Sequence, residues 1–439
     1  MSPVRLFVIF IFIRLAMYLF ETIAFSFSVN YLTMTYIAFV FFTVIIGYVM
    51  GNLLYDFHIQ KNISRENPQI IKQNWNYRGN FNIIIYCIIF FLIFYMIDFL
   101  FIKQGNFDEG PASARLYLSQ GSGGLLESMF RGIILLSAGF GIIVGAILVY
   151  LKSTMSKRQY SLCIALYLFS IVITLTTGVR NYAFFSLLFL IIAYFSNPDR
   201  RQISTKSLVK FGLLCVVVVC VFGYIFQQRY SIYRNFDARD YVSYLSYVLG
   251  YQIFENITEL NLSDSVLWIS MIPMMLYNYF SQGLYVLNDF INAPHLPEPF
   301  FGAYNFGSYF GLFSKIGLFG ISGESIVSTI EMYDLHPGSY NTLFGAAILD
   351  FGIVGSLFFV LLLVIISQIN YRCVLKYNRQ KIFTAFHLLN IYFCLLFGTA
   401  FIYSLFGISV GAFIPLNIII LSLFNLRFRK NVTIKLCNY

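Results

Sequence analysis

Three arginines and His336, one of two histidines in the long segment 228–341, have side chains that could bind an anion and move a proton. Arg229, Arg234 and Arg239 follow a hydrophobic run at intervals of five residues, and His336 lies near the end of the segment. Guanidinium groups keep their charge and donate hydrogen bonds in pairs, so they suit a phosphate or pyrophosphate. An imidazole that titrates near neutrality suits a general base for a hydroxyl nucleophile. Because steps of five rotate by roughly 140° on a helix, only one or two of the arginines can face one ligand, and Arg229 and Arg234 lie nearest the preceding hydrophobic run.

Arg180 lies in a short turn, Thr176-Thr-Gly-Val-Arg-Asn-Tyr182, between two hydrophobic runs. Such an arginine either reaches lipid headgroups or binds an anionic ligand. The turn is very short and Gly178 precedes the arginine, which favours a functional position. We therefore predict that Arg180 belongs to the same anion site.

A tyrosine stripe follows the arginines at helical spacing, beginning with Tyr241 and Tyr244 and continuing to Tyr251. Stripes of this kind are typical of helix packing. Tyrosine also offers a flat apolar face and a hydroxyl group, which suit sugar rings. The sequence leaves both interpretations open.

Four ionisable residues fall inside hydrophobic runs, where charge is costly: Arg14, Glu21, Asp98 and Asp350. Arg14 and Glu21 lie seven residues apart on one helical face and are expected to pair. The alternative role for each is polar contact between helices.

Known metal and nucleophile motifs are missing from the sequence. It contains no pair of histidines at metal-ligand spacing, no Gly-x-Ser-x-Gly and no phosphate-binding Gly-Lys loop. The seven cysteines fall in hydrophobic runs or in basic loops and none lies in residues 228–341, so no disulfide framework is expected. We expect catalysis that needs neither metal nor cofactor.

Composition identifies the class of protein. Hydrophobic residues make up 59% of the 439 residues and charged residues only 11%. Several runs of 18 or more apolar residues have the length of a membrane span. The net charge of +10 does not indicate nucleic acid as a partner, because Lys and Arg collect in short loops between the spans.

The predicted fold is an all-α polytopic membrane protein with about ten transmembrane helices. Seven lie in residues 1–227, the large outer loop with interfacial helices occupies residues 228–341, and three more helices with a short tail fill residues 342–439. The ten spans are 4–27, 31–55, 81–102, 130–151, 160–178, 182–197, 208–227, 342–368, 383–405 and 409–426. Two weaker stretches, 266–280 and 301–320, would raise the number to twelve. The first span lacks a small-residue cleavage site and is expected to be retained.

Charge predicts the orientation. The alternate loops and the tail, together with Arg5, carry 20 of the 29 Lys and Arg residues. Both termini are therefore expected in the cytoplasm. Residues 228–341 carry ten acids against three arginines and Lys315, which disfavours binding to anionic headgroups along the whole segment.

Three features resemble the O-antigen polymerases, the oligosaccharide repeat-unit polymerases of bacterial surface polysaccharide assembly. The first is the many-span layout with one large outer loop late in the chain. The second is the hairpin Gly178-Val-Arg180. The third is His336-Pro-Gly-Ser-Tyr-Asn-Thr-Leu followed by Leu349-Asp-Phe-Gly-Ile-Val-Gly355. This third run is also similar to the O-antigen ligases, in which a His-Asn step precedes a Gly-containing helix; here Asn341 follows His336 after four residues.

The resemblance implies a GT-C-like glycosyltransferase in the bacterial inner membrane, with its active site on the periplasmic side. The family transfers a growing glycan from undecaprenyl pyrophosphate to a sugar hydroxyl on a new lipid-linked repeat unit, with inversion and without a metal. It implies His336 and Arg180 as catalytic residues. Pyrophosphate and glycan would contact Arg229, Arg234, Arg239, Tyr241, Tyr244 and Asn341. Membrane lipid and a chain-length regulator protein are the further partners it allows.

Two other functions fit parts of the pattern. An O-antigen ligase would use similar chemistry to move glycan to lipid A core. A transporter or lipid-linked oligosaccharide flippase is expected to show internal repeats and ionisable groups near the membrane midplane. We detect no such repeat, and the candidate polar residues gather at the predicted outer face.

Overall fold

The computed structural model describes residues 1–25, 29–59, 77–102, 125–152, 155–176, 180–197, 240, 283–284, 286–293, 295–306, 342–379, 382–401, 409–423 and 428–429. Long apolar helices dominate these residues, as a lipid environment requires, because each backbone polar group must be hydrogen-bonded within its own segment. Among the described helices, five are long and apolar enough to cross a membrane, and three shorter ones are also apolar. The chain is an integral, polytopic membrane protein.

Nine of the ten predicted spans coincide with helices in the described part of the chain. Two of these helices, α2 and α4, continue into π-helical turns, η1 (Tyr55–Ile59) and η3 (Asp98–Ile102). The span predicted at 208–227 lies outside the described residues. The nine helices are α1 (Pro3–Phe25), α2 (Tyr31–Leu54), α4 (Tyr77–Ile97), α6 (Leu125–Leu151), α7 (Lys157–Thr176), α8 (Arg180–Ser196), α15 (Leu343–Arg379), α16 (Ala385–Gly398) and α17 (Ser409–Leu423).

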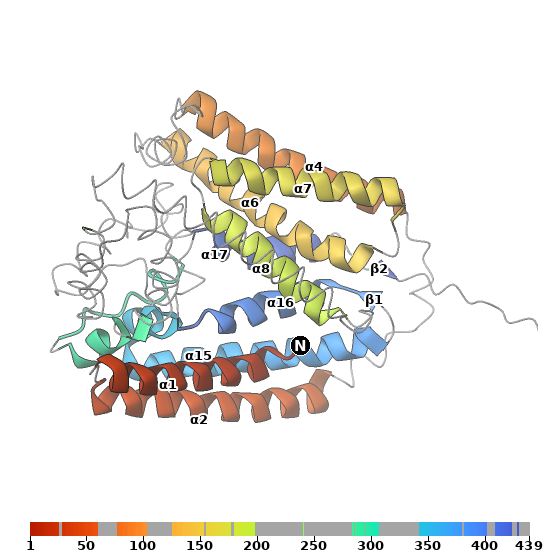
Figure 1. The fold of residues 1–439 in the computed structure, drawn as a ribbon. Coiled ribbons are helices and arrows are strands. Elements are labelled where there is room, and N and C mark those ends of the chain that lie inside the picture. Colours follow the sequence, from red (N-terminus) through yellow and green to blue (C-terminus); the bar gives the residue numbers. More distant parts are fainter. Residues whose placement is uncertain are drawn as a thin grey trace, which may run out of the picture.

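The helices form two groups (Figure 1). The first group contains α1, α2 and α15, which lie side by side although α15 is more than 280 residues distant in sequence. The second contains α4, α6, α7 and α8, with α17 packed on α6. Residues from the beginning and the end of the chain thus build one half of the bundle together.

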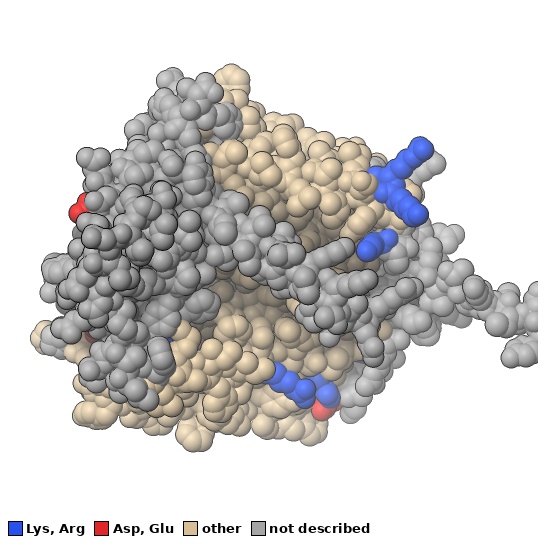
Figure 2. Space-filling model, viewed as in Figure 1, with Lys and Arg blue, Asp and Glu red and all other residues tan. Residues whose placement is uncertain are grey.

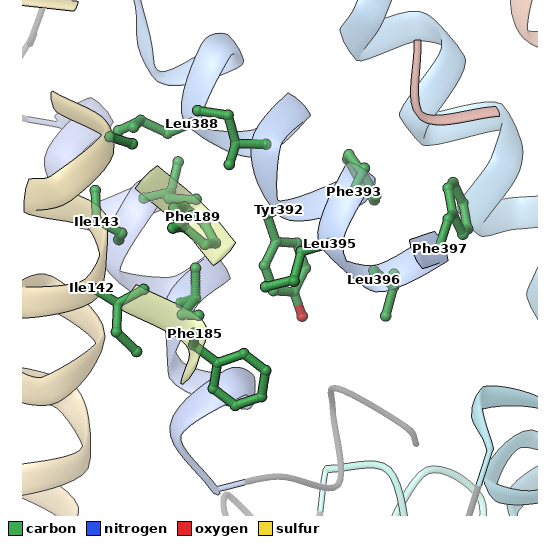
Figure 3. Close-up of a cluster of buried hydrophobic side chains, with 14 of the residues drawn as sticks. Ile142, Ile143, Phe185, Phe189, Leu388, Tyr392, Phe393, Leu395, Leu396 and Phe397 are labelled. Atoms are coloured by element: carbon green, nitrogen blue, oxygen red, sulfur yellow. The ribbon is translucent and has the colours of Figure 1, made fainter. Parts of the chain in front are cut away.

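Helix α16 joins the two groups, because it contacts α1 and α15 on one side and α8 and α17 on the other. Figure 3 shows Leu388 and Tyr392 of α16 beside Phe185 and Phe189 of α8. On the opposite side of α16, Phe397 stacks on Phe7 of α1 with ring centroids 4.6 Å apart. The hydrophobic core therefore runs through α16 without a break.

Helices α2 and α15 pack closely because α2 carries two glycines one turn apart. A Cβ added at Gly47 would lie 2.8 Å from the Val364 side chain, and one at Gly51 would lie 2.8 Å from Gln368 Cβ. Small residues at this spacing let two helix backbones approach in a membrane. Two hydrogen bonds join the same pair of helices: one between the hydroxyl groups of Tyr36 and Ser356 (2.8 Å), and one from Gln368 Nε2 to Asn52 Oδ1 (3.0 Å).

The Lys and Arg residues that are visible on the face in Figure 2 gather toward one end of the bundle, which we call the basic end. Several contacts bring the helix ends together there. Arg372 pairs with Asp56 at 2.7 Å, the Tyr150 ring lies against His387, and the strands β1 (Ile382–Phe383) and β2 (Phe428–Arg429) pair antiparallel. These residues belong to, or adjoin, the loops that charge predicts to be cytoplasmic. The short strand pair was not predicted from the sequence.

Candidate functional site

Most of the predicted site residues lie outside the described part of the chain. These residues are Arg229, Arg234, Arg239, Tyr241, Tyr244, His336 and Asn341. Their roles remain predictions from the sequence. Arg180 is described through its backbone only, as the first residue of α8.

The structure places Arg180 in a helical hairpin, as the sequence predicts. Helix α7 ends at Thr176 and α8 begins at Arg180, at the end of the bundle opposite the basic end. Tyr182, two residues later, is fully buried and stacks on Phe91 with centroids 4.5 Å apart. Its hydroxyl group lies 3.0 Å from Ser170 Oγ on α7. Tyr182 therefore anchors the start of α8 in the core, less than one helical turn from the backbone of Arg180.

The ionisable residues inside predicted spans have different surroundings. Arg14 is buried within α1, whereas the side chain of Glu21 is not among those described, so their pairing remains a prediction. Asp98 is half-buried at the start of η3. Asp350 is completely buried in α15.

Helix α15 is kinked at Gly352, which has φ 71° and ψ 176°. Side chains other than glycine are strongly disfavoured there. In an uninterrupted helix, the carbonyls of Leu349 and Asp350 would accept hydrogen bonds from residues 353 and 354. Instead, the Leu349 carbonyl accepts from Phe300 N–H (3.1 Å) and the Asp350 carbonyl from Phe301 N–H (2.9 Å). Because of the kink, backbone carbonyls of α15 can accept hydrogen bonds from the segment that contains Phe300 and Phe301.

The Asp350 carboxylate holds the same segment from inside the protein. Its two oxygens accept hydrogen bonds from Tyr304 N–H (2.8 Å), Asn305 N–H (2.8 Å) and Asn305 Nδ2 (2.7 Å). Asn305 is also completely buried. We call this arrangement, Asp350 with residues 300–306, the Asp350 clamp. It is a polar contact between segments, one of the two roles that the sequence allowed.

A second polar junction lies at the same end of the bundle, where α2 begins. Asn288 Oδ1 accepts hydrogen bonds from Asn30 N–H and Thr33 Oγ1, each at 3.0 Å, and Asn292 Nδ2 donates to Asn288 O at 2.7 Å. Leu284 and Leu287, on the same stretch, belong to the hydrophobic core. Residues 283–306 were predicted as part of the large outer loop, and this described part of it packs into the bundle.

The arrangement can fix backbone positions at the end where Arg180 lies, but the described groups there do not form a complete chemical centre. The Asp350 carboxylate accepts three hydrogen bonds from N–H groups, so it acts as a structural acceptor. In the described residues, no group of three or more His, Cys, Asp or Glu could hold a metal ion. Asn305 was not predicted from the sequence. The available signal was Asp350, because an acid buried in an apolar helix requires a hydrogen-bond donor from another segment.

Comparison with known proteins adds the family. The sequence model of a family described as O-antigen polysaccharide polymerase Wzy matches residues 4–303. No curated protein and no solved structure matched the chain. The matched part runs from α1 through Arg180 and the three arginines at 229, 234 and 239 to the first residues of the Asp350 clamp. Because the match covers well over half of the 439 residues, the chain belongs to the O-antigen polysaccharide polymerase (Wzy) family.

Proposed function

We propose that the protein joins undecaprenyl-pyrophosphate-linked oligosaccharide repeat units into O-antigen or a related surface polysaccharide. The family match over residues 4–303 is the observation that carries this proposal. The membership supports a polymerase of the glycosyltransferase type in general, and the residue roles below come from the sequence. Lipid-linked glycans and membrane lipid are the partners, and a chain-length regulator protein is a candidate third.

The proposed reaction is a single displacement at the anomeric carbon of the growing glycan. A hydroxyl oxygen of the new repeat unit forms the glycosidic bond while the bond to undecaprenyl pyrophosphate breaks, which inverts the configuration. His336 takes the hydroxyl proton. Arg180 and one or two of Arg229, Arg234 and Arg239 neutralise the charge that develops on the leaving pyrophosphate. No metal takes part.

Glycan binding falls to the remaining predicted residues. Tyr241 and Tyr244 would offer aromatic faces to the sugar rings, and Asn341 would donate to a sugar oxygen. These three residues lie in the same segment, 228–341, as the proposed base and three of the four arginines. Arg180 is the proposed site residue that lies outside this segment.

The reaction is placed at the outer face of the bacterial inner membrane. The basic end of the bundle is the cytoplasmic one if the excess of Lys and Arg governs orientation, as it does in most membrane proteins. The start of α8, with Arg180, lies at the opposite end. With ten spans and both termini in the cytoplasm, residues 228–341 face the same side as Arg180.

The experiment is a glycan ladder assay in a strain that lacks the chromosomal copy. Arg180→Ala and His336→Ala should insert normally, yet leave cells with only single repeat units on their lipid. Arg158→Ala serves as the control, since Arg158 is an exposed arginine at the basic end. It should give the normal ladder.

Other outcomes separate the remaining possibilities. Normal ladders from both variants would contradict the proposed site, and loss with Arg180→Ala alone would contradict the role of His336. A ligase is distinguished by the loss of all attached glycan in the deletion strain. A flippase is distinguished by repeat units that accumulate on the cytoplasmic side.

A further inference from the structure

The first turns of α15 hold two distant points of the chain at once. Thr342, which precedes α15, is completely buried, and its Oγ1 accepts a hydrogen bond from Gly345 N–H at 2.9 Å. Leu343 N–H donates to the Ala400 carbonyl at 2.9 Å. Asp350 lies eight residues after Thr342, which is roughly 12 Å along a helix. Residue 306, at the end of the Asp350 clamp, and residue 342, at the start of α15, are therefore both held by the first turns of α15.

The chemistry of the clamp requires a carboxylate. The hydrogen bonds to the Asp350 side chain from Tyr304 and Asn305 all come from N–H donors, and a carboxylate is the side chain that offers only acceptors. An asparagine of the same shape would place its own N–H₂ group against one of these donors. Water cannot take over the role, because neither Asp350 nor Asn305 is exposed.

The clamp also holds backbone in conformations that are rarely populated. Phe301 has φ 50° and Gly302 has φ 94°, and Gly352 on the other side of the contact has φ 71°. Such conformations persist where the surroundings fix them from several sides. Here the carbonyls and the carboxylate of α15 accept hydrogen bonds from the backbone amides of residues 300, 301, 304 and 305. The exit point of the chain is thus set to one geometry.

We infer that Asp350 is a positioning residue for glycosyl transfer, which acts by fixing on α15 the point from which residues 307–341 start. This inference rests on the proposed function, because that stretch contains His336 and Asn341. Asp350 does not contact substrate in this role. It determines where the stretch that carries the proposed base begins, while the contacts of Thr342 and Leu343 fix the point at which the chain enters α15. Small displacements of a base are costly to the transfer rate.

The first test uses purified full-length protein with lipid-linked repeat units. Asp350→Asn should lower kcat by about 100-fold, the effect of a displacement of roughly 1 Å, while KM changes little. Asn305→Ala removes the Nδ2 hydrogen bond but leaves both backbone hydrogen bonds to the carboxylate, so it should lower kcat less. Ser356→Ala is the matched control, because it removes a buried polar contact of α15 six residues away and should leave kcat unchanged. Equal losses in Asp350→Asn and Ser356→Ala would overturn the inference.

A tether separates positioning from direct chemistry. In the double variant Asn305→Cys and Asp350→Cys, a disulfide can replace the hydrogen bonds between these two residues. The oxidised protein should recover most of the lost kcat, and reduction should remove it again, with the bond verified by mass spectrometry. No recovery in the oxidised, bonded protein would overturn the inference, since the carboxylate would then be needed for something other than attachment.

A readout without substrate keeps this result distinct from the proposed function. Amide hydrogen exchange at Tyr304 and Asn305 should be slow in the native protein and faster in Asp350→Asn. If the native protein makes no ladder, the proposed function fails whatever the exchange shows. If exchange at these two amides is the same in the variant, the clamp does not hold the chain and the inference fails even with an active polymerase.

Discussion

The two ends of α15 are held to other parts of the chain in different ways. At the basic end, Arg372 and Asp56 form an ion pair whose side chains are 36% and 46% exposed. At the other end, Asp350 is completely buried and accepts three hydrogen bonds from N–H groups. An exposed ion pair contributes about 0–1 kcal/mol, because water and salt screen it. Removal of a buried acceptor destabilises the protein by about 1–3 kcal/mol for each buried donor that is left without a partner.

This difference teaches which end depends on geometry and which depends on charge. The basic end needs positive charge for orientation, and many arrangements of Lys and Arg would supply it. The opposite end needs specific residues in specific conformations, since the clamp fails if a donor, the carboxylate or the kink is lost. Positional precision is thus concentrated at the end where Arg180 lies.

The largest expected effect is that of Gly352→Ala at the kink. Its Cβ would meet no atom within 4 Å, so the cost comes from the backbone alone, at φ 71° and ψ 176°. We expect a loss of about 2 kcal/mol in the free energy of unfolding. The protein can relieve it by straightening α15, which would release Phe300 and Phe301. Thermal unfolding in detergent and exchange at these two amides measure both effects.

The control for Gly352→Ala is Gly398→Ala, at the end of α16. A Cβ there would meet the nearest atom of Phe10 at 3.5 Å, which is an ordinary contact. That variant should unfold at the native temperature or slightly above it. Equal stability of the two variants would mean that the kink is not under backbone constraint.

A smaller effect is expected from Gly51→Ala, in the half of α2 nearer the basic end. Its Cβ would lie 2.8 Å from Gln368 Cβ and 3.1 Å from the Ile365 carbonyl oxygen, so the helices must separate. We expect a loss of about 1 kcal/mol, the lower end of the usual cost of overpacking. A Cβ at Gly47 would lie 2.8 Å from Val364 Cγ1 and 3.3 Å from the Leu361 carbonyl oxygen, so its backbone contact is looser and Gly47→Ala should cost less. A reversed order in thermal unfolding would contradict close packing at Gly51.

Much of the fold could be predicted from the sequence. The length of a hydrophobic run indicates a membrane span, and the charge of a loop indicates the side of the membrane that it faces. Helices α2 and α15 begin within one residue of the predicted boundaries, 31 and 342. The sequence did not show that α2 and α15 are neighbours, although Gly47 and Gly51 carry the spacing of a close helix contact. Pairing of distant helices depends on side-chain shape, and periodicity alone does not determine it.

The candidate site was less accessible to sequence reasoning. The position of Arg180 at a helix start could be predicted from the short turn around Gly178. The Asp350 clamp could not be predicted, because Asp350 and Asn305 are 45 residues apart and the local sequence around either residue does not indicate the other. Residues 283–306 were predicted to belong to the large outer loop because they lie between two predicted spans, yet Leu284 and Leu287 are core residues. Burial of such short segments depends on the surrounding helices.

The smallest expected effect is that of Arg372→Gln at the basic end. The guanidinium lies over the Tyr55 ring at 5.3 Å and pairs with Asp56 through one nitrogen. Its Nε is buried and has no hydrogen-bond partner among the described residues, so the pair is not a complete network. We expect a loss below about 1 kcal/mol, reduced further by salt.

A double-mutant cycle of Arg372→Gln with Asp56→Asn tests this directly in thermal unfolding at low and high salt. The coupling between the two sites should be roughly 0.5 kcal/mol at low salt and should shrink as salt is added. A salt-independent coupling of several kcal/mol would show that the basic end is held as specifically as the Asp350 clamp. In that case geometry would constrain both ends of α15, and its hydrogen bonds would not distinguish the end near the Asp350 clamp. A weak, salt-sensitive coupling instead leaves the basic end free to vary in sequence so long as its charge remains.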